Sequence, residues 1–148
     1  MRAADAELIS QTLERIAETG ADITPDIYEA FFRLRPEAVA MFGDEHDMGR
    51  GHMINEVFLS LIDQANGADY LDELARGFVR SHHSYGLRGM EAYGDFFAAL
   101  RAAIAQTLAS DWPKPEQDAL ARQCEAMLTR FQQAERALID EKLIGPAS

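Results

Sequence analysis

Apolar residues recur at helical spacing along almost the whole chain, and no stretch alternates apolar and polar residues as a half-buried strand would. This pattern predicts an all-α fold with about seven helical segments. Because the breaks at Pro36, Gly67 and Pro113 come too often for a coiled coil, we expect a globular arrangement of crossed helices. One long run of this kind contains Tyr93, Phe96, Phe97, Leu100, Ile104 and Leu108.

Proline and glycine mark where the helices begin and end. Thr24-Pro25-Asp26 predicts a helix start, with an N-cap hydroxyl, a proline at the first helical position and an acid in the first turn. Pro36 ends that helix, because the residue before a proline avoids the α conformation, and it opens a short segment that closes near Phe42. Further helices are expected over about 5–19, 53–66 and 69–85, and after Pro113.

Length and composition limit the class of protein. With 148 residues, 47% of them hydrophobic, we expect one globular domain over 1–148. The net charge of -11 argues against nucleic acid and anionic membrane surfaces as partners. A single cysteine, Cys124, rules out an internal disulfide, and the acidic first residues do not resemble a signal peptide. We therefore expect a cytoplasmic protein; whether it forms a homodimer stays open.

A histidine on an apolar helical face is the first candidate for chemistry. With about 100° of rotation per residue, Leu71, Leu74, Phe78, His82 and Tyr85 fall within roughly 80° of one another, so His82 should point inward. A buried imidazole needs a partner for each ring nitrogen. That partner is either a metal or an ordinary hydrogen-bonding group such as a backbone carbonyl, and the periodicity alone does not choose between them.

Two segments of the chain resemble the globin family, specifically single-domain bacterial haemoglobins and the globin part of flavohaemoglobins. In the stretch 28–42, Tyr28 lies eight residues before Pro36 and Phe42 lies six after it, which is similar to the B and C helices of that family. The run His82-His83-Ser84-Tyr85-Gly86-Leu87 is similar to the end of helix F. The resemblance covers roughly residues 5–140 and implies a globin fold around a haem pocket.

The resemblance implies haem b as the cofactor and His82, rather than His83, as the ligand of its iron. Phe42 would stack on the porphyrin, and the Tyr28 hydroxyl would donate a hydrogen bond to the bound gas. Met53, Val57 and Phe78 are expected among the residues that line the haem.

The resemblance also implies two residues around the iron-ligating imidazole. Glu135 would accept the proton of the second ring nitrogen of His82, and Tyr93 would hold that carboxylate in place. The distal residue is left open between Arg50, His52 and Met53. Of these, His52 lies nearly opposite the apolar face of its helix, so we expect it at the surface.

As a function, the resemblance implies binding of O2 and related diatomic ligands, NO or CO, for oxygen transport or storage. Removal of NO is a further implied activity; because no flavin or nicotinamide domain follows the last helix, it would need a separate reductase, and enzyme status stays open. The alternative is a haem-free globin-fold sensor or interaction protein. A third reading, an unrelated helical bundle, predicts near-parallel helices, whereas the globin reading predicts crossings near about 50°.

Overall fold

The computed structural model describes residues 2–42, 47–87 and 89–145, which form helices joined by turns and contain no strand. The expected all-α chain is confirmed. No helix in these three ranges is both long and apolar enough to cross a membrane. The α-helices are α1 (Arg2–Thr19), α2 (Thr24–Leu34), α3 (Val39–Phe42), α4 (Asp47–Ala65), α5 (Leu71–Ser84), α6 (Glu91–Leu108) and α7 (Lys114–Asp140), with single 3-10 turns at Pro36–Ala38 and Ala109–Asp111.

The helix ends follow the proline and glycine signals with one correction. Thr24 was expected as the N-cap of α2, but it is the first helical residue, and its N–H donates to the Asp22 side chain (Oδ1, 3.0 Å). The Asp22 carboxylate thus satisfies an amide that would otherwise lack a partner at the helix start. At the other end, Arg35 leaves the helical conformation with φ -137° and ψ 80°, as expected for the residue before Pro36.

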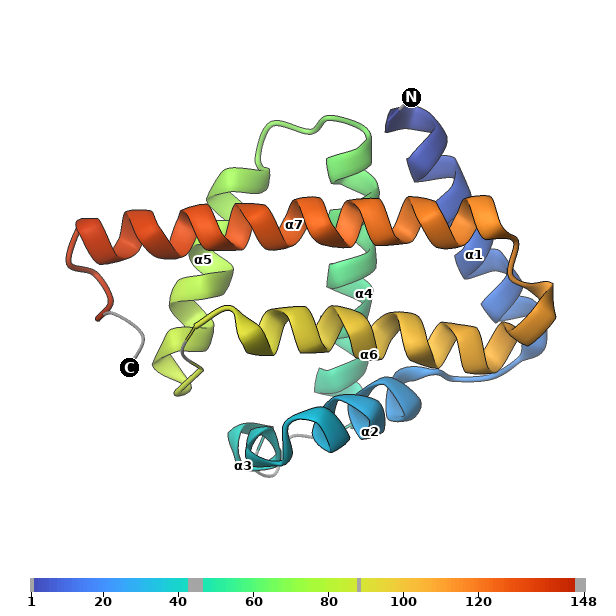
Figure 1. The fold of residues 1–148 in the computed structure, drawn as a ribbon, viewed down its shortest axis with the longest axis horizontal. Coiled ribbons are helices and arrows are strands. Elements are labelled where there is room, and N and C mark those ends of the chain that lie inside the picture. Colours follow the sequence, from blue (N-terminus) through green and yellow to red (C-terminus); the bar gives the residue numbers. More distant parts are fainter. Residues whose placement is uncertain (1, 43–46, 88, 146–148) are drawn as a thin grey trace.

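The helices cross rather than run parallel. Figure 1 shows α6 and α7 side by side, with α4 and α5 lying crosswise to both. The helix α1 packs on α4 and α7, α2 packs on α4 and α6, and α5 packs on α7. This arrangement differs from the near-parallel helices that an unrelated helical bundle would have.

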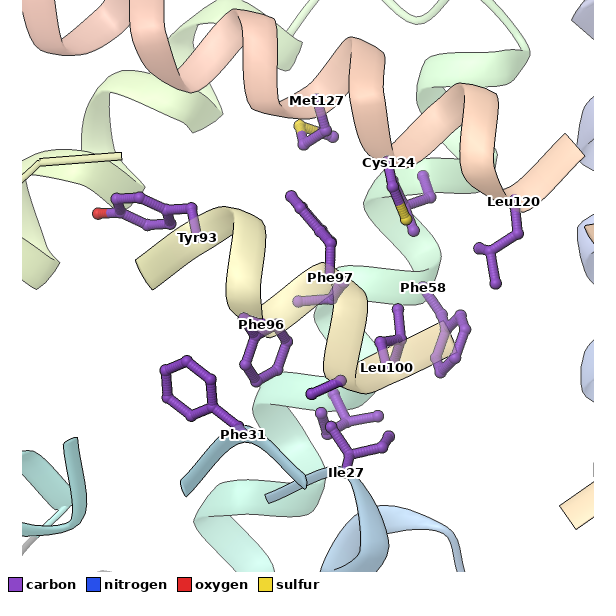
Figure 2. Packing of buried hydrophobic residues seen from close by; sticks show 14 of the residues in the cluster. Ile27, Phe31, Phe58, Tyr93, Phe96, Phe97, Leu100, Leu120, Cys124 and Met127 are labelled. Carbon is purple, nitrogen blue, oxygen red and sulfur yellow. The ribbon is translucent and has the colours of Figure 1, made fainter. Parts of the chain in front are cut away.

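The core is one cluster of buried side chains drawn from all six long helices. Aromatic rings dominate its centre, where the rings of Phe31 and Phe96 meet edge to face at a centroid distance of 5.3 Å. Figure 2 shows Phe96, Phe97 and Leu100 of α6 between residues of α2 and α7. The packing of α6 against both α2 and α7 therefore connects an early helix of the chain with its last one.

Two buried carboxylates attach α1 to α7. Glu116, 1% exposed, accepts hydrogen bonds from the Thr12 hydroxyl (2.8 Å) and from Arg15 Nε (3.0 Å). Asp5, 7% exposed, accepts from Arg122 Nη2 (2.7 Å) and from Gln123 Nε2 (3.0 Å). A buried carboxylate without such partners would be strongly destabilising, so these contacts determine where α1 lies.

The Asp5 contact makes stability depend on pH. The hydrogen bond from Arg122 is the main reason why the pKa of Asp5 lies below its ordinary value of 3.8. Since the folded pKa is lower than the unfolded one, the contact stabilises the fold above about pH 4, and this stabilisation is lost as the pH falls through the folded pKa. We expect Asp5→Asn to reduce the free energy of unfolding at pH 7 by about 1–2 kcal/mol, and by less at pH 3.

Urea unfolding at both pH values measures this difference. Asp69→Asn, which changes an exposed carboxylate in the turn between α4 and α5, serves as a control and should have little effect at either pH. An Asp5→Asn effect of the same size at pH 3 and pH 7 would contradict the assignment.

Candidate functional site

Helix α5 presents two rows of side chains, and His82 belongs to the row that lines a cavity. Leu71, Ala75 and Val79 form the first row and are buried. Leu74, Phe78 and His82 form the second row, are half-buried, and line a cavity of about 450 Å³. The predicted apolar face is therefore divided between the core and the cavity.

Tyr85 does not share this face, which corrects the prediction for that residue. Its side chain is 64% exposed. The reason is that α5 ends at Ser84, so the rotation of about 100° per residue no longer applies at Tyr85.

The His82 ring is held in one orientation by two contacts with Phe78. Its Nδ1 lies 2.8 Å from the Phe78 carbonyl oxygen, and the two rings stack at a centroid distance of 4.0 Å. Because a carbonyl only accepts, Nδ1 carries the proton, which leaves Nε2 with a free lone pair. Burial lowers the pKa of His82, while the bond to Phe78 opposes that shift. The result is a neutral imidazole in the tautomer that binds a metal through Nε2.

Aromatic and aliphatic side chains from five helices make up most of the cavity wall. Among the residues predicted to line a haem, Met53, Val57, Phe78, His82 and Tyr93 all lie on this wall. Several further members of the wall are buried apolar residues, and helical spacing alone does not distinguish a cavity wall from a core. These are Phe31, Leu61, Phe96, Phe97, Met127 and Phe131.

The structure does not form the hydrogen bonds expected from His82 to Glu135 and from Tyr93 to Glu135. The rings of His82 and Tyr93 are 6.0 Å apart, and the Tyr93 hydroxyl is buried without a hydrogen-bond partner. Burial raises the pKa of Tyr93, and the nearby Glu135 carboxylate adds to that shift. The Nδ1 proton predicted for Glu135 goes instead to the Phe78 carbonyl, which lies one helical turn before His82 and is always within reach.

The structure separates the three candidates for the distal residue. Met53 lines the cavity. Arg50 lies over the Tyr28 ring, 5.3 Å from its centroid, and lines a different hollow of about 500 Å³. The His52 side chain is 72% exposed and its Nε2 lies 3.2 Å from a Glu56 carboxylate oxygen, so it is at the surface as expected.

Tyr28 lies behind Met53 rather than on the cavity wall. Only 1% of the residue is exposed, and its hydroxyl donates weakly to the Arg50 carbonyl at 3.4 Å and to the Met53 sulfur at 3.5 Å. Phe42 ends α3, and its side chain lies outside the described residues. Of the residues predicted for the distal side, the structure therefore brings Tyr28 and Met53 into contact and places only Met53 on the cavity wall.

His82 contributes a single imidazole to a mostly apolar wall. Within the described ranges there is no group of three or more His, Cys, Asp or Glu side chains that could hold a metal ion. Comparison with protein-family models and with curated proteins finds no match for this chain. The function has to be inferred from the chemistry of the cavity itself.

Gly77 is a cavity residue that sequence analysis missed, although a glycine inside a helix is a visible signal. It lies in α5, and a Cβ added there would meet no atom within 4 Å. A glycine inside a helix lowers the free energy of unfolding by about 0.5–1 kcal/mol relative to alanine. Gly77 therefore destabilises α5 but adds no side chain to the cavity.

We expect Gly77→Ala to raise the free energy of unfolding by about 0.5–1 kcal/mol, since the added methyl group meets open space. Gly77→Leu should weaken binding of Nile red, an uncharged apolar dye, because the longer side chain reaches into the cavity. Urea unfolding and dye titration measure the two effects.

Gly51 provides the matched control, because it is also inside a helix with open space around it but lines the other hollow. Gly51→Ala should stabilise similarly, and Gly51→Leu should leave dye binding unchanged. Equal loss of dye binding in both leucine variants would contradict the role of Gly77.

Proposed function

We propose that this chain is a globin-type haem protein that binds diatomic gases, with His82 as the proximal ligand of the haem iron. The observation that carries the proposal is a neutral imidazole, held by the Phe78 carbonyl at 2.8 Å, in the wall of an apolar cavity of about 450 Å³. The porphyrin of haem is flat and apolar and already supplies four ligands to its iron. A protein therefore needs to add little more than such a cavity and one nitrogen ligand.

The pairing of the helices also supports the proposal. The sequence resemblance matches 28–42 to the B and C helices of a globin and 82–87 to the end of helix F, and the crossed arrangement in Figure 1 is of the kind that the resemblance predicts. Five residues predicted from sequence to surround a haem come from three different helices and line one cavity.

The side chains of the cavity suit the apolar part of haem b in their chemistry. Aromatic rings of α5, α6 and α7 offer flat surfaces for a porphyrin, and the Nε2 of His82 is the nitrogen left for its iron. When bound, haem supplies an iron atom that takes O2, NO or CO. The carboxylates of haem fit less well, because acidic side chains surround the mouth of the cavity.

In this proposal three residues of the site have separate roles. His82 holds the iron, and the Phe78 carbonyl keeps the imidazole in its ligating tautomer. Tyr28 is not on the cavity wall, but its hydroxyl lies 3.5 Å from the sulfur of the cavity-lining Met53, and from there it would serve as the hydrogen-bond donor to a partly negative gas ligand. Any turnover of NO would need a source of electrons.

The second candidate is a haem-free globin-fold sensor or interaction protein that takes another apolar ligand. The specific observation that favours it is the presence of Glu56, Asp63 and Glu73 among the cavity-lining residues, because haem carries two carboxylates of its own. In this case the chain would bind an uncharged apolar molecule and remain colourless.

An absorption spectrum of the purified protein with haemin separates the two candidates. We expect a Soret band and ferrous-CO spectrum typical of a histidine-ligated haem. That spectrum should be lost in His82→Gly, regained by the same variant in free imidazole, and kept in His83→Ala. Rescue by imidazole shows that the variant is folded and lacks only its ligand. Protein that stays colourless with haemin would overturn the haem proposal and leave the second candidate.

A second test concerns Tyr28. We expect Tyr28→Phe to speed O2 dissociation from the reduced haem protein about tenfold, because a hydrogen bond to a partly charged acceptor contributes about 1.5 kcal/mol. Tyr85→Phe is the control, since Tyr85 is 64% exposed and its ring lies 6.2 Å from the His82 ring, on the proximal side. Stopped-flow replacement of O2 by CO measures the rates. Equal rates in both variants and the wild type would remove Tyr28 from the gas site.

A further inference from the structure

The exposed part of the cavity wall is acidic. Glu56 and Glu73 are exposed, and Asp63 is half-exposed; all three line the cavity. They come from the facing helices α4 and α5, so they surround the mouth on two sides. Among the residues that the structure describes, no lysine or arginine lies on this wall. We call these three carboxylates the acidic mouth.

Neighbouring groups offset the charge of the acidic mouth only in part. The His52 imidazole pairs with Glu56 at 3.2 Å and cancels its charge only when protonated. The Tyr70 hydroxyl, which is neutral, donates to Asp63. Arg76 is near enough to Glu73 for an electrostatic interaction, but its guanidinium is bound to Glu141 at 2.7 Å. A negative potential therefore remains at the mouth.

One residue of the wall behind the mouth carries an unsatisfied polar group. Tyr93 lines the cavity, is only 6% exposed, and has a hydroxyl without a hydrogen-bond partner. Figure 2 shows this hydroxyl directed away from Phe96 and Phe97. A buried donor without a partner is rare in folded proteins, and this one lies beside the cavity, close enough to the Glu135 carboxylate to feel its charge.

We propose that the acidic mouth weakens the hold on haem, so that this chain exchanges haem with its surroundings instead of keeping it permanently. The inference rests on the proposed function. Haem is dianionic through its two carboxylates, and like charges near a surface repel each other with an energy that depends on distance and salt. The iron and the apolar walls attract haem, while Glu56, Asp63 and Glu73 oppose its carboxylates. The chain thus favours a porphyrin whose carboxylates are neutralised or masked.

The sign of the salt effect is the first test. Haem loss is followed as transfer of haemin from the loaded protein to an excess of apomyoglobin. Raising the salt concentration from about 0.01 M to about 1 M shortens the Debye length from about 30 Å to about 3 Å, so repulsion at the mouth is screened and haem loss should slow. A site that holds haem through cationic side chains would lose it faster in salt, and that result would overturn the inference.

Charge-neutralising variants give the second test. Glu56→Gln and Glu73→Gln should each slow haem loss by about two- to fivefold at low salt, and the double variant should slow it further. Glu18→Gln is the matched control with the same change in net charge. It lies on α1, at the opposite end of the molecule from α5 in Figure 1, and should leave the rate near that of the wild type.

A haemin dimethyl ester, in which both carboxylates are uncharged, provides the third test. Its rate of loss should be the same from the wild type and from the Glu56→Gln and Glu73→Gln variants. If the variants change the ester rate as much as the haemin rate, the effect is one of packing and the inference is overturned. Failure of the protein to bind haemin at all overturns the proposed function together with this inference, whereas binding without the charge dependence overturns this inference alone.

Discussion

The cavity exists because α4 and α5 are both attached to α7. Gln64, near the end of α4, donates to the backbone oxygen of Gln123 at 2.9 Å, and Arg130 of α7 donates to the side chain of Gln64 at 2.9 Å. The same arginine reaches Asp72 at the start of α5, 2.5 Å away. These bonds hold one end of each helix on α7. The remaining lengths of α4 and α5 are lined with side chains that face the cavity between them, so the site depends on this anchoring.

His82 shows how a polar group is accommodated in an apolar wall. Burial favours the neutral form, and the Phe78 carbonyl takes the only proton that a neutral imidazole carries. One ring nitrogen is then satisfied inside the protein and the other is not. The same reasoning applies to Tyr93, whose buried hydroxyl has no partner. His82 therefore offers its second nitrogen to the cavity, and Tyr93 places an unsatisfied hydroxyl in the protein beside it.

The strongly negative composition has a local consequence as well as a general one. A net charge of -11 suggests solubility. If the carboxylates were spread evenly over the surface, they would have no further local effect. In the structure, three of them instead lie around the cavity, and within the described ranges no lysine or arginine lines it. An apolar cavity with an acidic mouth discriminates between ligands by the charge of the end that stays in solvent. That discrimination is a property of the arrangement and not of any single residue.

Sequence alone determined the helical class, the breaks at Pro36 and Gly67, and the face of α5 that bears His82, because proline, glycine and apolar spacing act over a few residues. Only the tertiary structure decided that this face is divided between core and cavity, that Met53 rather than Arg50 reaches the cavity, and that the His82 proton goes to Phe78. Periodicity states which way a side chain points from its own helix. It does not state how far away the next helix lies, and that distance determines whether a residue is packed, lines a cavity or meets water.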